Sequence, residues 1–220
     1  MSAMPDLDPL RLLPQERDHR TSLLGAVTGA TLTEYLCELP AAPRLHLGLN
    51  TLPDPPLPIT AHVPFAIQED AWQRCGEDLL AFLNAGSRSL NGQPRPRTSA
   101  FSPPTQTLQR LMRPDSIVLV WKATVIAADD GDTSLILVRE LMEGSQPDLN
   151  HLDPAIVRPG LAAWAVDRAG FAVFAWARTD SPGSPVTVGE EVLDPDDEVF
   201  RPLAAILAAQ YGSTSGTFRS

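Results

Sequence analysis

The side chains with the clearest chemistry in this chain are five arginines in a stretch that holds no acid. The stretch runs from Leu79 to Pro114 and carries a formal charge of +5, which leaves −15 on the rest of the chain (−10 minus +5). A guanidinium group can bind a phosphate or a carboxylate through two parallel N–H bonds. This arginine stretch is therefore the main candidate for binding an anion or an acidic partner, although it could also lie against the chain's own acidic surface or be solvated. Its members are Arg88, Arg95, Arg97, Arg110 and Arg113.

Two histidines form a second candidate site. His46 and His62 occupy polar positions in two short alternating segments, residues 44–49 and 58–63, which we expect to be neighbouring strands. With a carboxylate from residues 69–70, two imidazoles could bind a metal ion or act as a general base. Because nothing in the sequence fixes the register of the two strands, surface or half-buried histidines are the simpler interpretation. A pocket at this histidine pair, acting on a small anion together with the arginine stretch, is kept as an alternative.

Other reactive side chains favour structural roles. Asp129, Asp130 and Asp132 could bind a hard cation, but the spacing of an EF-hand is missing, so we interpret them as a hairpin tip. Cys37 and Cys75 show no C-x-x-C spacing, so we expect two buried thiols, and a disulfide between them stays open. The sequence holds no glycine-rich phosphate loop, nucleophile elbow or zinc signature. We therefore predict no catalytic residue, no metal site and no cofactor, and we favour a protein that is not an enzyme.

Composition limits the kind of partner. The chain has 220 residues, of which 43% are hydrophobic, and this is enough for a sizeable core. Its formal charge of −10 repels phosphate backbones and anionic membranes at long range. No apolar run approaches the length of a membrane span, and the first thirty residues show no basic start followed by an apolar stretch. We expect a cytoplasmic protein that does not bind membranes, and binding of nucleic acid is disfavoured.

Alternating apolar segments supply the framework that must position these side chains. Two pairs of segments are each joined by a turn signal. Residues 128–132, which contain Asp-Gly, join the first pair, and residues 167–170, which end in Gly, join the second. Each pair therefore predicts an antiparallel hairpin. The expected strands cover residues 44–49, 58–63, 116–127, 133–141, 161–166 and 171–178.

Helical periodicity is clearest in residues 67–85, where apolar side chains repeat at three- and four-residue steps and Gly86 suits the C-terminal end. A last helix is expected at residues 199–211, with Leu203, Ile206 and Leu207 facing inward. Shorter helices are expected at residues 31–39 and 105–113.

Antiparallel strands with helices before and after them indicate an α+β fold. We predict an antiparallel sheet of about four to six strands built on the two hairpins, with helices packed mainly on one face. Residues 1–30 are expected to form a loosely ordered N-terminal arm with one helical turn, residues 31–212 a single α+β domain, and residues 213–220 a disordered tail.

These features favour a non-enzymatic binding or adaptor protein that engages a protein or acidic partner, and a homodimer is compatible with this interpretation. In layout alone, an acidic α+β domain that ends in a helix is similar to secretion-chaperone-like domains, without a shared motif, and this likeness implies a chaperone-like role. One alternative is the small-anion-binding domain or enzyme described above. Another is single-stranded nucleic-acid binding through residues 88–113, with arginines near aromatic stacking platforms.

Overall fold

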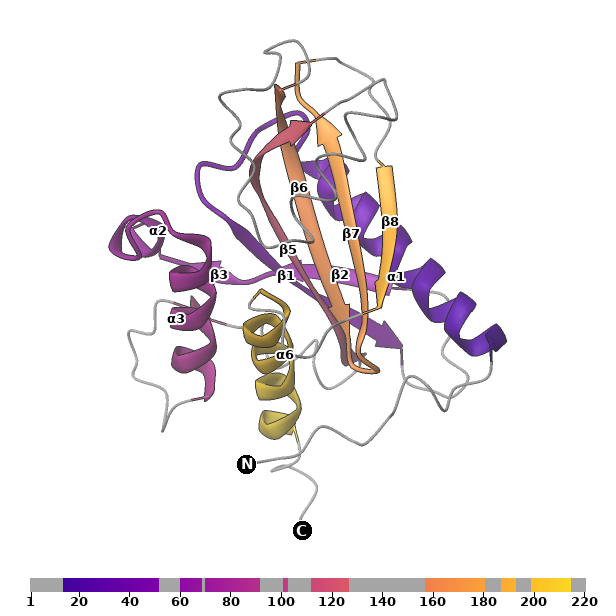
Figure 1. The fold of residues 1–220 in the computed structure, drawn as a ribbon. Coiled ribbons are helices and arrows are strands. Elements are labelled where there is room, and N and C mark those ends of the chain that lie inside the picture. The colour runs from indigo at the N-terminus through magenta and orange to yellow at the C-terminus, as the bar shows by residue number, and fades with distance from the viewer. Residues whose placement is uncertain are drawn as a thin grey trace.

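The computed structural model describes residues 14–51, 60–68, 70–91, 101–102, 112–126, 157–180, 187–192 and 199–214. Its main feature is an antiparallel six-stranded sheet with the strand order β2-β1-β5-β6-β7-β8 (Figure 1). A short separate pair joins β3 to β4. The strands are β1 (Arg44–Thr51), β2 (Thr60–Pro64), β3 (Ala66–Ile67), β4 (Phe101–Ser102), β5 (Met112–Ile126), β6 (Val157–Asp167), β7 (Phe171–Arg178) and β8 (Thr187–Val192). The prediction of an α+β fold with an antiparallel sheet is confirmed.

Strand β5 lies in the interior of the sheet, between β1 and β6. Its residues Ile117, Val118, Leu119 and Val120 are all fully buried, on both faces of the sheet. A strand that is apolar on both faces is stable only where both faces are covered. The continuous apolar run of residues 117–121 is therefore typical of an interior strand such as β5.

The hairpin formed by β6 and β7 is confirmed. Its turn ends at Gly170, which has a φ of 87° that a residue with a side chain rarely adopts. The Oδ1 atom of Asp167 accepts hydrogen bonds from the backbone N–H groups of Ala169 and Phe171 and so holds the turn closed. The second strand expected for the other hairpin, residues 133–141, and its Asp-Gly turn lie outside the described residues.

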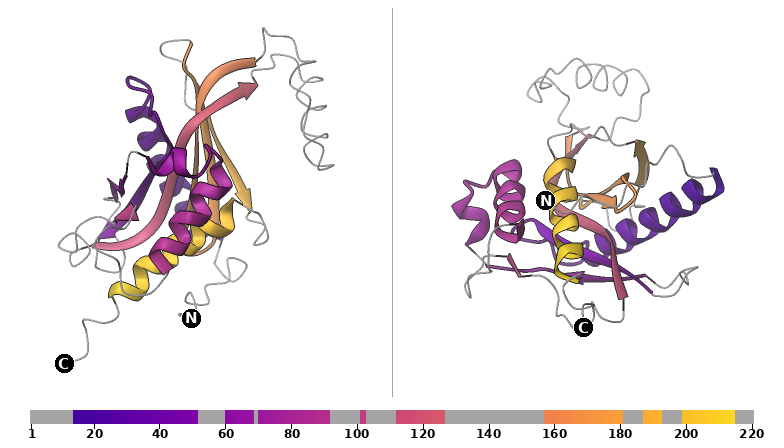
Figure 2. Two further views of the ribbon diagram at one scale, coloured as in Figure 1. Left: turned by 90° about the vertical axis from the view of Figure 1, so that its left-hand side faces the viewer. Right: turned by 90° about the horizontal axis from the view of Figure 1, so that it is seen from below.

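Four helices occur in the described part of the chain: α1 (Pro14–Glu34), α2 (Ala71–Arg74), α3 (Leu79–Asn91) and α6 (Phe200–Thr214). Helix α1 lies behind the sheet in Figure 1, and α6 lies in front of it, beside α3 (Figures 1 and 2). We call the two sides of the sheet the α1 face and the α6 face. The expectation that helices pack mainly on one face is therefore not confirmed, because a helix at residues 14–34 was not foreseen.

Helix α1 replaces most of the loosely ordered arm that we expected at residues 1–30. Its buried stripe includes Thr21, Leu24, Thr28 and Thr31, which repeat at three- and four-residue steps. The hydroxyl groups of Thr28 and Thr31 donate hydrogen bonds to the carbonyl oxygens of Leu24 and Val27. Because these bonds satisfy the hydroxyl groups within the helix, threonine can take the place of larger apolar residues on a buried face.

The prediction of a single helix at residues 67–85 is wrong, because the chain forms two helices, α2 and α3, with a break between them. Gly76 and Glu77 both have positive φ values, 68° and 58°, which no α-helix contains. Asp78 then accepts a hydrogen bond from the backbone N–H of Ala81 and caps the start of α3. Gly86, expected to end the helix, lies inside α3 and is buried.

Two other expected helices also differ. Residues 31–34 are the last turn of α1, and a turn and bends follow at residues 35–38 in place of further helix. Met112 and Arg113 belong to β5, whereas residues 105–111 lie outside the described residues. The last helix is confirmed, since Leu203, Ile206 and Leu207 are fully buried. It continues through residues 213–214, which we had assigned to the tail.

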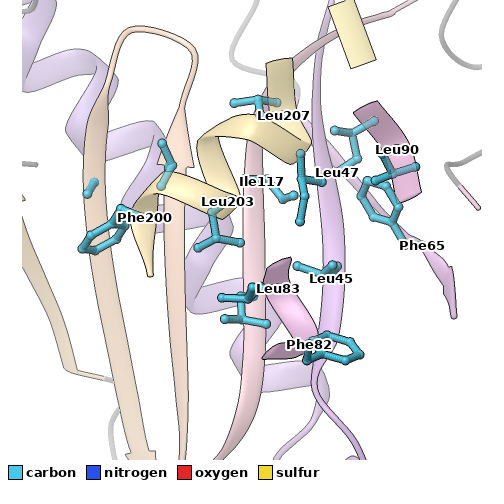
Figure 3. Packing of buried hydrophobic residues seen from close by; sticks show 14 of the residues in the cluster. Leu45, Leu47, Phe65, Phe82, Leu83, Leu90, Ile117, Phe200, Leu203 and Leu207 are labelled. Atoms are coloured by element: carbon cyan, nitrogen blue, oxygen red, sulfur yellow. The ribbon is translucent and has the colours of Figure 1, made fainter. Parts of the chain in front are cut away.

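The sheet separates two apolar cores. On the α6 face, Leu45, Leu47 and Ile117 of the sheet pack against Leu83 of α3 and Leu203 of α6, as Figure 3 shows. On the α1 face, smaller side chains lie under the helix, where Ala163, Ala165 and Ala175 meet Leu24 and Leu32. Small side chains let α1 approach β6 and β7 closely. Among the described residues, no helix has both the length and the apolar character needed to cross a membrane.

Candidate functional site

The structure describes only part of the arginine stretch. Arg88 is exposed in the last turn of α3, and Arg113 belongs to β5, opposite Asn50 of β1. Arg95, Arg97 and Arg110 lie outside the described residues, as do the three aspartates at residues 129–132. A site built from all five arginines therefore stays a prediction.

The register of β1 and β2 brings the two histidines together. Gly48 lies opposite His62, and His46 lies opposite Pro64, so the two histidines are diagonal neighbours on the α1 face. Their ring centroids are 5.7 Å apart in an edge-to-face arrangement. The sequence suggested that His46 and His62 could lie close together, but it did not fix the strand register that brings them together.

The end of α1 adds two further polar side chains to the histidine pair. Glu34 Oε1 lies 2.9 Å from His62 Nε2, and the hydroxyl group of Tyr35 lies 2.8 Å from His46 Nε2. The described carboxylate beside the histidines is therefore that of Glu34. Asp70, which the sequence suggested, pairs with Arg74 instead, and residue 69 lies outside the described residues. We call Glu34, Tyr35, His46 and His62 the histidine cluster.

His46 is the buried member of this cluster. It is 2% exposed, and its Nδ1 atom has no hydrogen-bond partner among the described residues. The pKa of the His46 imidazole is lowered from 6.5 to about 4, mainly by burial; His62 and Arg44 contribute to this lowering, and Glu34 opposes it. Burial likewise raises the pKa of the Tyr35 hydroxyl. Both groups are therefore neutral near pH 7.

The neutral state of His46 also favours one tautomer. A buried N–H without a partner loses more free energy than a buried lone pair that lacks a donor, since amide-like donors are strongly hydrated in water. The proton is therefore better placed on Nε2, where it is donated to the Tyr35 oxygen. Tyr35 is partly exposed, so its own hydroxyl hydrogen can bond to water.

The histidine cluster is better suited to holding two elements together than to catalysis. His62 and Glu34 resemble a base with its orienting carboxylate, and the side chains are 19% and 56% exposed. However, both hydrogen bonds join the end of α1 to the sheet, and no described hydrogen bond links these histidines to a serine, threonine or cysteine side chain. No group of three or more His, Cys, Asp or Glu side chains within the described ranges could hold a metal ion.

A second set of polar side chains joins the N-terminal half of α1 to the sheet, through Arg20. Arg20 of α1 lies 3.3 Å from Asp167 at the end of β6, and Arg168 lies 2.9 Å from Asp115 of β5. Burial raises the pKa of the Asp167 carboxyl, although its hydrogen bonds with Phe171 and Ala169 and its contact with Arg20 act in the opposite direction. These contacts close the β6–β7 turn and therefore have a structural role.

The α6 face carries a surface that the sequence reasoning did not identify. Trp121, Ala162 and Trp176 lie side by side in register on β5, β6 and β7, with the small alanine between the two tryptophans. Neighbouring strands are about 4.8 Å apart, so roughly 10 Å separates the backbones that carry the two indoles. Both tryptophans are partly exposed, and Trp176 belongs to neither apolar core.

Two arginines adjoin these tryptophans on the same face. Arg178 follows Trp176 by two residues on β7 and lies opposite Gly160 of β6, and Arg158 precedes Gly160 by two residues on β6. Arg178 makes two hydrogen bonds of 3.0 and 3.1 Å with the carboxylate of Asp180, and Arg158 lies 3.6 Å from the same carboxylate. We call Trp121, Trp176, Arg158 and Arg178 the Trp–Arg surface.

Cys37 and Cys75 are not joined by a disulfide. Both are free thiols, which answers the question of a disulfide between them. Cys75 packs against the core of the α6 face, as expected, but Cys37 is exposed because α1 ends before it.

No family model, curated protein or solved structure matches this chain.

Proposed function

We propose that this protein is a non-enzymatic binding or adaptor protein that holds a segment of a partner polypeptide on its Trp–Arg surface. The observation that carries the proposal is the row of Trp121, Ala162 and Trp176 across three strands, with both indoles partly exposed. Tryptophan and arginine are the residues most enriched among the side chains that dominate protein–protein binding. The small, half-buried Ala162 lies between the two tryptophans, and the ring of Trp121 also packs edge-to-face on Trp164, with centroids 4.9 Å apart.

The arginines define the chemistry of the partner. Asp180 shows that the guanidinium of Arg178 is oriented to accept a carboxylate through two N–H bonds. Because the side chains of Arg158 and Arg178 are 37% and 33% exposed, a second carboxylate can approach them from solvent. We therefore propose a partner segment that carries an aromatic or aliphatic side chain close to an aspartate or glutamate.

The experiment uses a displayed library of random peptides selected on the immobilised protein, followed by affinity measurements on the enriched peptides. We expect enrichment of peptides that combine an apolar anchor with an acid. Trp176→Ala should weaken their binding roughly 30-fold, which corresponds to about 2 kcal/mol at a dominant interface residue. Arg178→Ala should weaken binding less and should reduce its dependence on salt.

A matched control is available in Arg74→Ala, because Arg74 of α2 is an exposed arginine that likewise pairs with an aspartate, Asp70, away from the Trp–Arg surface. This variant should bind like the wild type, and thermal unfolding should show that all variants are folded. Equal peptide binding by wild type and Trp176→Ala would contradict the proposal. The proposal would also be contradicted if the wild type bound no peptide but self-associated, and Trp176→Ala abolished this self-association. The occupant of the surface would then be a second copy of the chain.

Single-stranded nucleic acid is the competing occupant, because indoles and arginines also bind unpaired bases. The formal charge of −10 disfavours it. An oligothymidylate that binds tightly, loses affinity steeply with salt and depends on Trp121 and Trp176 would replace the peptide proposal.

A further inference from the structure

The end of α1 is attached to the edge of the sheet by the histidine cluster. Helix α1 ends at Glu34, and the two hydrogen bonds from Glu34 and Tyr35 reach β2 and β1 respectively. The ring of Tyr35 also packs edge-to-face on His46, with centroids 5.6 Å apart. His46 can therefore become exposed to water only if Tyr35 separates from it.

Protonation of His46 in its buried position has no compensating partner among the described residues. A protonated imidazole has two N–H groups, and the one on Nδ1 would point at no acceptor. The charged groups around it are Arg44 on β1, His62 on β2 and Glu34 on α1. Of these, only Glu34 is negative, and it is 56% exposed and already bonded to His62.

From this geometry we propose that the histidine cluster is an acid-sensitive latch, which releases Tyr35 and the end of α1 from His46 of β1 as the pH falls below neutrality. This inference goes beyond the binding role and does not depend on it. Opening the latch places His46 in water, where its imidazole can be protonated freely. The segment that moves is small, and local opening of this kind requires less free energy than unfolding of the sheet.

The direction and size of the effect follow from the pKa of His46 in the two states. The closed state has a pKa of about 4 and an opened, hydrated imidazole has one near 6.5. The closed state is therefore fully favoured above pH 6.5 and loses stability as the pH falls from 6.5 towards 4. Between pH 7 and pH 5, the ratio of closed to open molecules should fall roughly 20-fold.

Hydrogen exchange measured by mass spectrometry tests this on the full chain. The measured quantity is the protection factor, which corrects each rate for the intrinsic effect of pH. We expect protection of residues 31–37 to fall roughly 20-fold between pH 7 and pH 5. At both pH values it should lie below the protection of residues 161–166 and 172–177 of the β6–β7 hairpin, because the latch opens without unfolding the sheet. In His46→Gln, which cannot be protonated, the fall should be no more than about two-fold.

His19→Gln is the matched control, because His19 is an exposed histidine on the same helix. This variant should behave like the wild type. The latch is refuted if protection of residues 31–37 is unchanged at pH 5, if these residues are as protected as the hairpin and therefore open only with global unfolding, or if His46→Gln responds as the wild type does.

If His46→Gln does not fold, the titration of His46 by NMR in the wild type decides the question. Protonation with an apparent pKa shifted below 6.5 and coupled to loss of protection supports the latch. Protonation near pH 6.5 with full protection of residues 31–37 overturns it.

Discussion

Gly48 shows how one missing side chain shapes the sheet beside the histidine cluster. Gly48 lies between His62 of β2 and Ser116 of β5 in register. A Cβ atom at this position would collide with the hydroxyl group of Ser116, which is itself buried. The space that a side chain would take at position 48 is therefore already filled by a neighbouring strand.

This contact predicts the sign of a substitution. In the interior of a strand, replacing glycine by alanine normally stabilises by about 0.5–1 kcal/mol. Here we expect Gly48→Ala to destabilise the protein by about 1–3 kcal/mol, because the site becomes overpacked. Urea unfolding measures the change.

Ser116→Ala provides the control, because it removes the oxygen atom that collides. In the Ser116→Ala background, Gly48→Ala should cost much less than it does alone. Equal effects in the two backgrounds would show that Ser116 is not the obstacle.

At the residue scale, the sequence could place His46 and His62 but not their partners. Period-two alternation identified the strands and the polar face on which each histidine lies. Glu34 and His62 are 28 residues apart, and their contact depends on where α1 crosses the sheet. The pairs that form the Trp–Arg surface depend likewise on the register of β5, β6 and β7, which composition does not reveal.

At the scale of elements, the break between α2 and α3 is the clearest difference between the sequence-based prediction and the structure. An apolar stripe at residues 71–83 predicted one helix, but left-handed backbone at Gly76 and Glu77 interrupts it. A side chain at position 77 costs free energy in this conformation, whereas glycine adopts it readily. Capping of α3 by Asp78 helps to offset this cost.

We expect Glu77→Gly to stabilise the protein by about 0.5–1 kcal/mol and Gly76→Ala to destabilise it by about 1–2 kcal/mol. No atom lies within 4 Å of a Cβ built at Gly76, so a steric clash cannot cause the second effect. Thermal or urea unfolding measures both changes, with Gln73→Ala on exposed helix as a control that should stay within about 0.5 kcal/mol. If Gly76→Ala were neutral, the break would not have the described backbone.

Helix α1 was missed for a different physical reason. Its buried stripe contains threonines, which ordinary hydropathy counts as polar, although their hydroxyl groups are satisfied by carbonyl oxygens within the helix. The alanine-rich face of β6 and β7 accepts such a helix because both surfaces are small. Strands with strong apolar runs, and α6 with its large aliphatic side chains, were predictable because burial of those residues dominates their environment.

At the scale of the molecule, β5 and β6 belong to both apolar cores at once. Leu119 faces one core and Val118 the other, so the loss of either core removes support from the same strand. We therefore expect the described sheet and its helices to unfold in one cooperative transition.

Two probes on opposite faces can test this. Trp72, Trp121 and Trp164 pack against the core of the α6 face, and Trp176 lies on that face too, so tryptophan fluorescence reports that face. A fluorophore on the exposed Cys37, in a Cys75→Ala background, reports the end of α1. The two urea midpoints should coincide near pH 7.

Substitutions in each core sharpen the test. Leu32→Ala on the α1 face and Leu207→Ala on the α6 face remove fully buried side chains, and each should cost about 2–5 kcal/mol. Each variant should shift both probes by the same amount. Midpoints that separate, or a variant that shifts only its own probe, would show that the faces unfold independently.

The order in which the chain is made adds a constraint on how α1 comes to rest. This helix is synthesised before the sheet, yet it packs mainly on β6 and β7, whose residues begin at Val157. At a translation rate of about 5–20 residues per second, the ribosome needs roughly ten seconds to deliver those strands. During that interval the threonine-lined helix has no surface to dock on, although most of the stability of a protein helix comes from packing of its buried face. A helix made before the sheet is thus among the last elements to reach its final position.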